Sequence, residues 1–166
     1  MTGADIGAGY LAAFEPSMRL ALELAAATDI GSAVASDVPV GAVVLDQDGQ
    51  KLGQGRNQCL AATDPTAHAE IVAIRQAAGA ARSWRLDGCT LVVTLEPCTM
   101  CAGAVRNSRI RRVVYGAADP RAGAAGSLWD VLRDRRLGPP VEVFGGILAA
   151  ECAALVSGFF QRRRTE

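Results

Sequence analysis

Two short motifs in this chain combine residue types that bind a metal ion. His68 and Glu70 are separated by one residue, and further along the chain Cys98 and Cys101 are separated by two. Cysteines three positions apart on a helix face the same way, so they can share one soft metal ion. One imidazole and two thiolates are three of the four ligands of a tetrahedral zinc ion, which leaves one position for water. We therefore predict a zinc site formed by His68, Cys98 and Cys101.

The chain offers few other ways to build such a site. His68 is the only histidine among the 166 residues, so an imidazole ligand has no other source. Two thiolates balance the charge of Zn²⁺, and the partial positive charge of a helix start favours the thiolate form of both cysteines. Water held by zinc loses a proton near neutral pH, and a carboxylate beside it can move that proton to a substrate. We predict Glu70 as this catalytic residue.

Plainer interpretations of the same residues stay open. A histidine at a helix start is more often a cap or a core residue, and a glutamate there is often only solvated. The two cysteines could be reduced core thiols or, since they follow a predicted strand, a thioredoxin-like redox pair. A purely structural zinc site would need a fourth protein ligand. The candidates for that ligand are Cys59, Cys89 and Cys152.

The spacing of His68 and Glu70 raises a geometric problem. Asp64 and Pro65 are typical of a helix cap and a first helical position, and they predict a helix to about residue 78 that stops at Gly79. Residues two apart on a helix diverge by about 200°. His68 and Glu70 can therefore converge on one ion only if the first turn of the helix holds them. The buried stripe of this helix is predicted as Ala67, Ile71, Ile74 and Ala78.

The remaining elements alternate between strands and helices. Strands are predicted over residues 38–45, 51–56, 89–95, 112–115 and 141–144, and helices over residues 11–27, 97–106, 127–134 and 148–163. This alternation predicts an α/β protein, a three-layer α/β/α sandwich. Its central five-stranded sheet is mixed, because the first two strands form a hairpin. The length suits one domain over residues 1–166.

The charges of the chain cancel overall but are unevenly distributed. Residues 1–96 contain six basic and eleven acidic residues, and residues 97–166 contain eleven basic and six acidic ones. Any affinity for nucleic acid is therefore predicted in the C-terminal part. The five cysteines are an odd number, which favours thiol chemistry or metal binding over disulfide bridges. No apolar run approaches the roughly 18 residues of a membrane span. We expect a cytoplasmic protein with no membrane association.

The two motifs together resemble the zinc-dependent cytidine and deoxycytidylate deaminase superfamily, whose signature joins H-x-E to P-C-x-x-C. Within it, the chain is most similar to the bacterial tRNA-specific adenosine deaminases. The matching segments are residues 38–42, 64–70, 94–98, 100–103, 108–110, 123–128, 147–148 and 151–155. This resemblance implies a cytidine deaminase-like fold. It also implies hydrolytic conversion of adenosine to inosine at the wobble position of a tRNA anticodon.

The resemblance further implies roles for single residues. His68, Cys98 and Cys101 would hold one zinc ion per subunit, and Glu70 would move protons. The implied substrate-binding residues are Asn57, Asp119, Arg121, Phe159 and Phe160. Phosphate contacts are predicted from Arg106, Arg109, Arg111, Arg112, Arg162, Arg163 and Arg164. Glu96, beside the cysteines, is expected to be a structural partner rather than the catalytic acid. The implied partners are a tRNA anticodon stem-loop and a second copy of the chain in a homodimer.

Two rival functions keep part of this chemistry. One is a zinc deaminase of a free base or nucleotide of the guanine or cytosine type. The other is a non-catalytic zinc or RNA-binding module, which would need four protein ligands. A loop over residues 58–63 without basic residues and a short insertion over residues 30–36 depart from the family pattern. Neither the tRNA that serves as substrate nor the preferred flanking nucleotides follow from the sequence.

Overall fold

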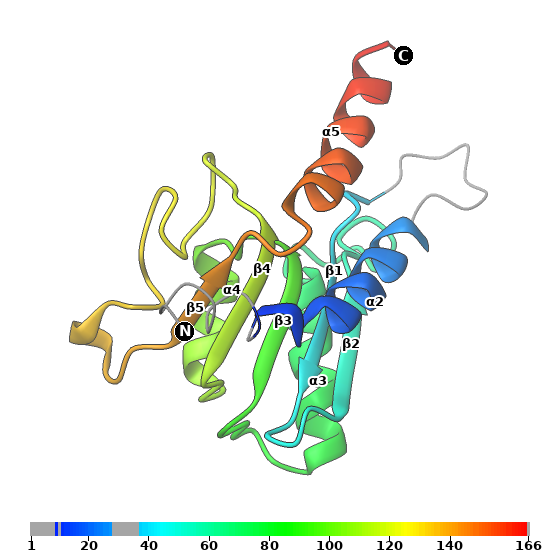
Figure 1. The fold of residues 1–166 in the computed structure, drawn as a ribbon. Coiled ribbons are helices and arrows are strands. Elements are labelled where there is room, and N and C mark those ends of the chain that lie inside the picture. The colour runs from blue at the N-terminus through cyan, green and yellow to red at the C-terminus, as the bar shows by residue number, and fades with distance from the viewer. Residues whose placement is uncertain (1–8, 10, 28–36, 166) are drawn as a thin grey trace.

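The computed structural model describes residue 9, residues 11–27 and residues 37–165. The predicted insertion over residues 30–36 lies outside the described residues. The elements follow the predicted alternation of strands and helices (Figure 1). In chain order they are α2 (Glu15–Ala26), β1 (Gly41–Leu45), β2 (Lys51–Arg56), α3 (Ala69–Ala81), β3 (Thr90–Leu95), α4 (Thr99–Asn107), β4 (Arg112–Ala117), η2 (Arg135–Leu137), β5 (Glu142–Gly145) and α5 (Ala149–Thr165).

The five strands form one mixed sheet in the order β2-β1-β3-β4-β5. Strand β1 is antiparallel to both β2 and β3, whereas β3, β4 and β5 run parallel. The turn between β1 and β2 is held by Asp46, whose carboxylate accepts hydrogen bonds from the backbone N–H groups of Asp48 and Gln50. The predicted mixed five-stranded sheet is confirmed.

Each face of the sheet carries its own hydrophobic core. Successive side chains of a strand point to opposite faces, so in β1 Ala42 and Val44 join the core under α3 and α4, while Val43 and Leu45 join the core under α2. Cys152 brings α5 into that second core. Figure 1 shows the resulting three layers, with α5 extending past the end of the sheet. None of the helices in the described ranges is long and apolar enough to cross a membrane.

Helix α3 begins later than predicted. Asp64 closes a turn instead, because its carboxylate accepts hydrogen bonds from the backbone N–H and the hydroxyl of Thr66. His68 has an extended backbone (φ −66°, ψ 153°) and is the N-cap of the helix. The helix also continues past Gly79 to Ala81. The predicted boundaries were therefore wrong at both ends.

The buried face of α3 is set by two glycines of β2. A Cβ atom at Gly53 would lie 2.4 Å from the backbone oxygen of Ala73, and one at Gly55 would lie 2.6 Å from that of Ala69. The helix thus lies almost directly on the strand, and only small side chains fit between them. Ala69, Ala73 and Ala77 fill this contact. The predicted stripe is right at Ala67 and Ile74 but wrong at Ile71 and Ala78, which are only half-buried.

The helix predicted over residues 127–134 is absent from this described segment. Its backbone forms turns and a bridge between Ala125 and Asp130, and the short 3₁₀ helix η2 follows. The backbone N–H groups of Leu128 and Trp129 both donate to the carbonyl oxygen of Gly123. These hydrogen bonds reach back across the loop, so the segment does not form the regular pattern of an α-helix.

Candidate active site

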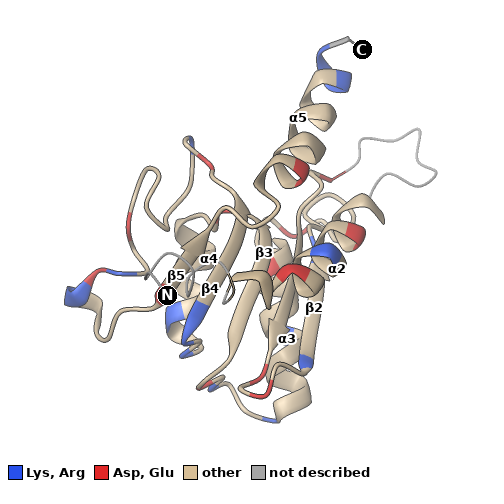
Figure 2. Ribbon diagram, in the orientation of Figure 1, with Lys and Arg blue, Asp and Glu red and all other residues tan. Residues whose placement is uncertain are grey.

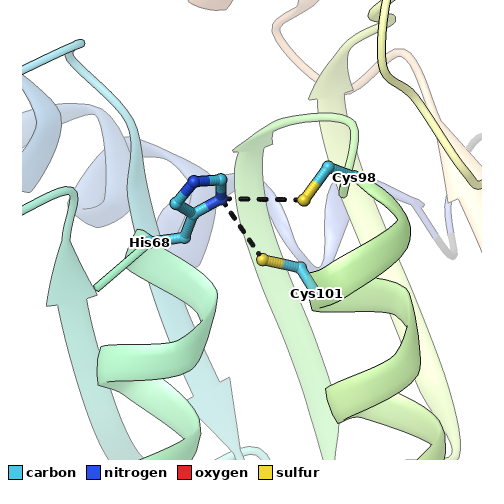
Figure 3. A group of neighbouring side chains, drawn as sticks. All are labelled: His68, Cys98 and Cys101. Carbon is cyan, nitrogen blue, oxygen red and sulfur yellow. Dashed lines mark hydrogen bonds between the residues drawn. The ribbon is translucent and has the colours of Figure 1, made fainter. Parts of the chain in front are cut away.

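Three side chains from the starts of two neighbouring helices meet beyond the end of β3. His68 caps α3, Cys98 caps α4, and Cys101 lies in the first turn of α4. The His68 Nδ1 atom lies 3.7 Å from the Cys98 Sγ atom and 3.5 Å from the Cys101 Sγ atom (Figure 3). The fold therefore brings the three predicted ligands together.

The distances between these atoms fit a single zinc ion. Bonds of about 2.3 Å to sulfur and about 2.05 Å to nitrogen, at a tetrahedral angle, separate the two ligand atoms by about 3.6 Å. The observed 3.5 and 3.7 Å agree with this value. In the described ranges, His68, Cys98 and Cys101 are the one group of three or more His, Cys, Asp or Glu residues close enough to hold an ion. Cys59, Cys89 and Cys152 are outside this group, so the described part of the chain offers three ligands.

The late start of α3 solves the geometric problem of the H-x-E motif. Because His68 precedes the helix and has an extended backbone, its ring is not held at the helical angle to Glu70. Glu70 lies in the first turn, and both residues line the same pocket. The motif can therefore place an imidazole and a carboxylate beside one ion.

The protein alone favours a thiolate at Cys98. The hydrogen bond from Cys101 and, after it, the contact with His68 lower the pKa of the Cys98 thiol to about 4, although burial opposes them. The same hydrogen bond, together with burial, raises the pKa of Cys101. The contact with Cys98 also raises the pKa of His68. The cluster is thus arranged to carry negative charge on sulfur, as a cation site requires.

Glu70 is almost completely buried beside this cluster, with 4% of its surface exposed. Burial raises the pKa of its carboxyl group to about 7, although its backbone hydrogen bond and His68 act in the opposite direction. A group that titrates near neutral pH can both accept and donate a proton under physiological conditions. The position of Glu70 is suited to proton transfer.

A pocket of about 220 Å³ opens at the cluster. It is smaller than the roughly 300–1,000 Å³ of sites for drug-sized ligands and suits a group the size of one base. Four predicted substrate-binding residues line it, namely Asn57, Asp119, Arg121 and Phe160. Phe159 does not line this pocket. It is buried, and its ring packs edge-on against Phe160 at a centroid distance of 5.3 Å.

The polar lining residues are held by specific contacts. Asn57 follows β2, donates from its side-chain amide to the carbonyl oxygen of Val38 and accepts a hydrogen bond from the N–H of Cys59. Arg121 lies over the Phe160 ring, with its guanidinium carbon 5.3 Å from the ring centroid. Arg121 and Phe160 thus form one composite wall, to which the loop after β4 and helix α5 each contribute a side chain.

Sequence reasoning missed the apolar part of the pocket. The additional apolar lining residues are Val38, Val40, Ala69, Leu95, Ala122 and Val156, and the carboxylate of Glu96 also lines the pocket. Val156 lies one helical turn before Phe160, so helical spacing could have found it. The others come from strand ends, loops and the first position of α3, where periodicity does not show which side chain turns toward the pocket.

The arginines that follow α4 lie at the other end of the sheet. Arg112 pairs with Thr90 at the start of β3, whereas the zinc ligands follow the end of that strand at Leu95. Arg111 and Arg112 form ion pairs with Glu142. Figure 2 shows the positive charge near the start of β4 separated from that at the end of α5. The structure does not bring this arginine group to the pocket.

Comparison with known proteins identifies the class of this site. Residues 14–117 match the cytidine and deoxycytidylate deaminase zinc-binding region. The chain belongs to this family of zinc-binding deaminases, which confirms the predicted family and zinc as its cofactor.

Two curated relatives show which members of this family the chain resembles. The chain is 48% identical over 152 residues to the tRNA-specific adenosine deaminase of Haemophilus influenzae, which covers 92% of this chain and 86% of that protein. It is 47% identical over 133 residues, or 80% of this chain, to the tRNA(Ile)-lysidine synthase of Deinococcus deserti, but spans only 25% of that protein.

A solved structure of another protein has the same fold as this chain. It comes from work described as "Biochemical and Structural Studies of A-to-I Editing by tRNA:A34 Deaminases at the Wobble Position of Transfer RNA". It is 40% identical to this chain with a TM-score of 0.75, and the match covers 83% of this chain and 96% of that one. The predicted cytidine deaminase-like α/β fold is confirmed.

Proposed function

We propose that the protein hydrolytically deaminates adenosine to inosine at the wobble position of a tRNA anticodon. The observation that carries this proposal is the convergence of His68, Cys98, Cys101 and Glu70 at one base-sized pocket. The chain around this pocket is 48% identical to a tRNA-specific adenosine deaminase.

His68, Cys98 and Cys101 would hold the zinc ion, which, when bound, makes water a nucleophile at neutral pH. Glu70 accepts a proton from the attacking water and delivers it to a ring nitrogen of the adenine. The water oxygen bonds to C6, and Glu70 then carries the second proton of this oxygen to the exocyclic nitrogen. The bond from C6 to that nitrogen breaks, ammonia leaves, and C6 keeps the oxygen as a carbonyl group. Glu70 is buried, so it exchanges these protons with the substrate rather than with bulk water.

The pocket wall supports recognition of one flipped base. Val38, Val40 and Leu95 offer apolar contacts, and Asn57 offers an amide for hydrogen bonding. A purine taken out of its stack is read by such a combination of packing and polar contacts. Among the basic residues, Arg162, Arg163 and Arg164 at the end of α5 are the proposed phosphate contacts.

The proposal is tested with a short anticodon hairpin that carries adenosine at the wobble position. We expect inosine to form, and the same hairpin with guanosine there to stay unchanged. Substrate binding should weaken steeply as salt rises, because phosphate contacts release counterions. Deamination of free guanine or cytosine with no reaction on the hairpin would contradict the proposal and favour the rival with a small substrate.

We also propose that the protein acts as a homodimer in the cytoplasm. A tRNA substrate supports the location, and the family resemblance supports the dimer. Light scattering is expected to give twice the mass of one chain. A fully active monomer would contradict the homodimer.

A further inference from the structure

Glu96 is a buried carboxylate that lines the pocket, and all its hydrogen bonds go to one loop. It follows β3 directly, lies two residues before the ligand Cys98, and is 2% exposed. No lysine or arginine forms an ion pair with it in the described ranges. A buried charge of this kind is costly unless hydrogen bonds compensate it.

All four hydrogen bonds to the Glu96 carboxylate come from the loop over residues 119–127. Its Oε2 atom accepts from the N–H of Asp119 at 2.9 Å and from the hydroxyl of Ser127. Its Oε1 atom accepts from the N–H groups of Ala125 and Ser127, both at 3.0 Å. Burial alone would raise the pKa of Glu96, but these hydrogen bonds outweigh burial and lower it.

The same loop carries part of the pocket wall. The Asp119 carboxylate accepts hydrogen bonds from the N–H groups of Arg121 and Ala122, which fixes the turn. Arg121 then reaches across to the ring of Phe160. A shift of the loop would therefore move Arg121 away from its place beside Phe160.

The loop is also attached to the segment that carries the zinc ligands. The N–H of Ala124 donates to the carbonyl oxygen of Pro97 at 2.8 Å, and Gly123 forms a bridge with Cys98. A Cβ atom at Gly123 would lie 2.4 Å from the carboxyl carbon of Glu96 and 2.5 Å from the backbone oxygen of Asp119. The loop thus packs against Glu96 with no space for another atom.

We propose that Glu96 is a positioning residue, which holds the loop over residues 119–127 at a fixed place relative to the zinc ligands. Through this loop it sets the position of Arg121 in the pocket wall and so controls substrate binding. The predicted change in KM rests on the proposed function, whereas hydrogen exchange of the loop amides can be measured without any substrate.

The main test is Glu96→Gln in the full-length zinc-loaded protein. The amide keeps the size of the side chain but replaces one acceptor oxygen with an NH₂ group, which in either orientation faces at least one backbone N–H that it cannot bind. We expect hydrogen exchange at the amides of Asp119, Ala125 and Ser127 to accelerate roughly tenfold, which is the effect of losing a hydrogen bond to a charged group. KM for the hairpin should rise by a similar factor, with kcat and zinc content almost unchanged.

Glu142→Gln is the matched control. Glu142 also accepts several hydrogen bonds, but from Arg111 and Arg112 at the opposite end of the sheet. This variant should leave both the exchange of residues 119–127 and KM as in the unsubstituted protein.

Two milder changes keep the test decisive if Glu96→Gln folds poorly. Ser127→Ala removes only the hydroxyl donor and should raise loop exchange and KM by a smaller factor. Gly123→Ala leaves Glu96 intact but pushes the loop away, and should raise KM as Glu96→Gln does.

Unchanged loop exchange together with an unchanged KM in Glu96→Gln would overturn the proposal. Loss of zinc, or a fall in kcat at constant KM, would also overturn it, because Glu96 would then act on the metal centre. If the unsubstituted protein does not deaminate the hairpin, the proposed function fails, whereas the exchange experiment still decides whether Glu96 holds the loop.

Discussion

The zinc cluster and the rim of the pocket are built in different ways. The cluster uses two continuous motifs, each at the start of a helix, so the local backbone already orients His68, Cys98 and Cys101. The rim is assembled from the loop after β2, the loop after β4 and helix α5, which contribute Asn57, Arg121 and Phe160. Each zinc motif therefore orients its own side chains locally, and the fold has only to bring two helix starts together. The rim depends on contacts between three distant segments.

This difference predicts that changes to the cluster and changes to the rim have separate consequences. Substitutions in the cluster should abolish turnover, because no other group can supply the missing ligand or proton. Substitutions at the rim should raise KM and leave the chemical step in place.

The largest effect is expected from Cys98→Ala. With two ligands left, the site should no longer retain stoichiometric zinc, and deamination of the hairpin should fall below detection. Metal analysis measures the bound zinc, inosine formation measures deamination, and circular dichroism checks that the variant is folded. Full activity with no zinc bound would contradict the assignment of this residue as a ligand.

The next effect is expected from Glu70→Gln. This substitution keeps the shape of the side chain but removes its ability to move a proton, so kcat should fall by roughly 10²–10⁴-fold. Zinc content should stay at one ion per chain, measured on the same sample. Turnover within a few-fold of the unsubstituted protein would remove Glu70 from its proposed role.

Substitutions of the two neighbouring phenylalanines of α5 should have different effects, one on substrate binding and the other on stability. Phe160→Ala should raise KM for the hairpin roughly tenfold, as loss of an aromatic contact with a base does. Phe159→Ala should instead lower the free energy of unfolding by about 3–5 kcal/mol, because this ring is buried. Denaturant unfolding and steady-state kinetics on both variants test this, and the opposite assignment of the two effects would show that Phe159 is the substrate contact.

The smallest effect is expected from Arg111→Ala. Arg111 lies at the end of the sheet opposite the pocket and forms an exposed ion pair with Glu142. Such pairs contribute about 0–1 kcal/mol to stability, so unfolding should hardly change. KM for the hairpin should change less than twofold. A tenfold rise would show that RNA reaches this end of the molecule.

The same contrast explains what the sequence could predict. The strands and the residues of the cluster follow from local patterns, since apolar runs, a proline before Cys98 and the motif spacings all lie within a few residues. The start of α3 could not be predicted in this way, because an Asp before a Pro fits a helix cap and a turn equally well, and here Asp64 closes a turn on Thr66 before the helix begins. The buried face of α3 depends on Gly53 and Gly55, which belong to another element.

The helix predicted over residues 127–134 was wrong for a similar reason. Its polar and apolar spacing resembles a short helix, but the N–H of Ser127 is bound by Glu96, which lies 31 residues earlier. The N–H groups of Leu128 and Trp129 are bound by Gly123. The residue pattern within the segment does not indicate that Glu96 and Gly123 accept these hydrogen bonds.

X-ray absorption at the zinc edge of the purified protein tests the metal centre most directly. Two sulfur atoms at about 2.3 Å and two lighter atoms at about 2.0–2.1 Å are expected, for Cys98, Cys101, His68 and one position left for water. A shell of three or four sulfur atoms would mean that Cys59, Cys89 or Cys152 completes a closed structural site, and this result would contradict the catalytic role of the centre.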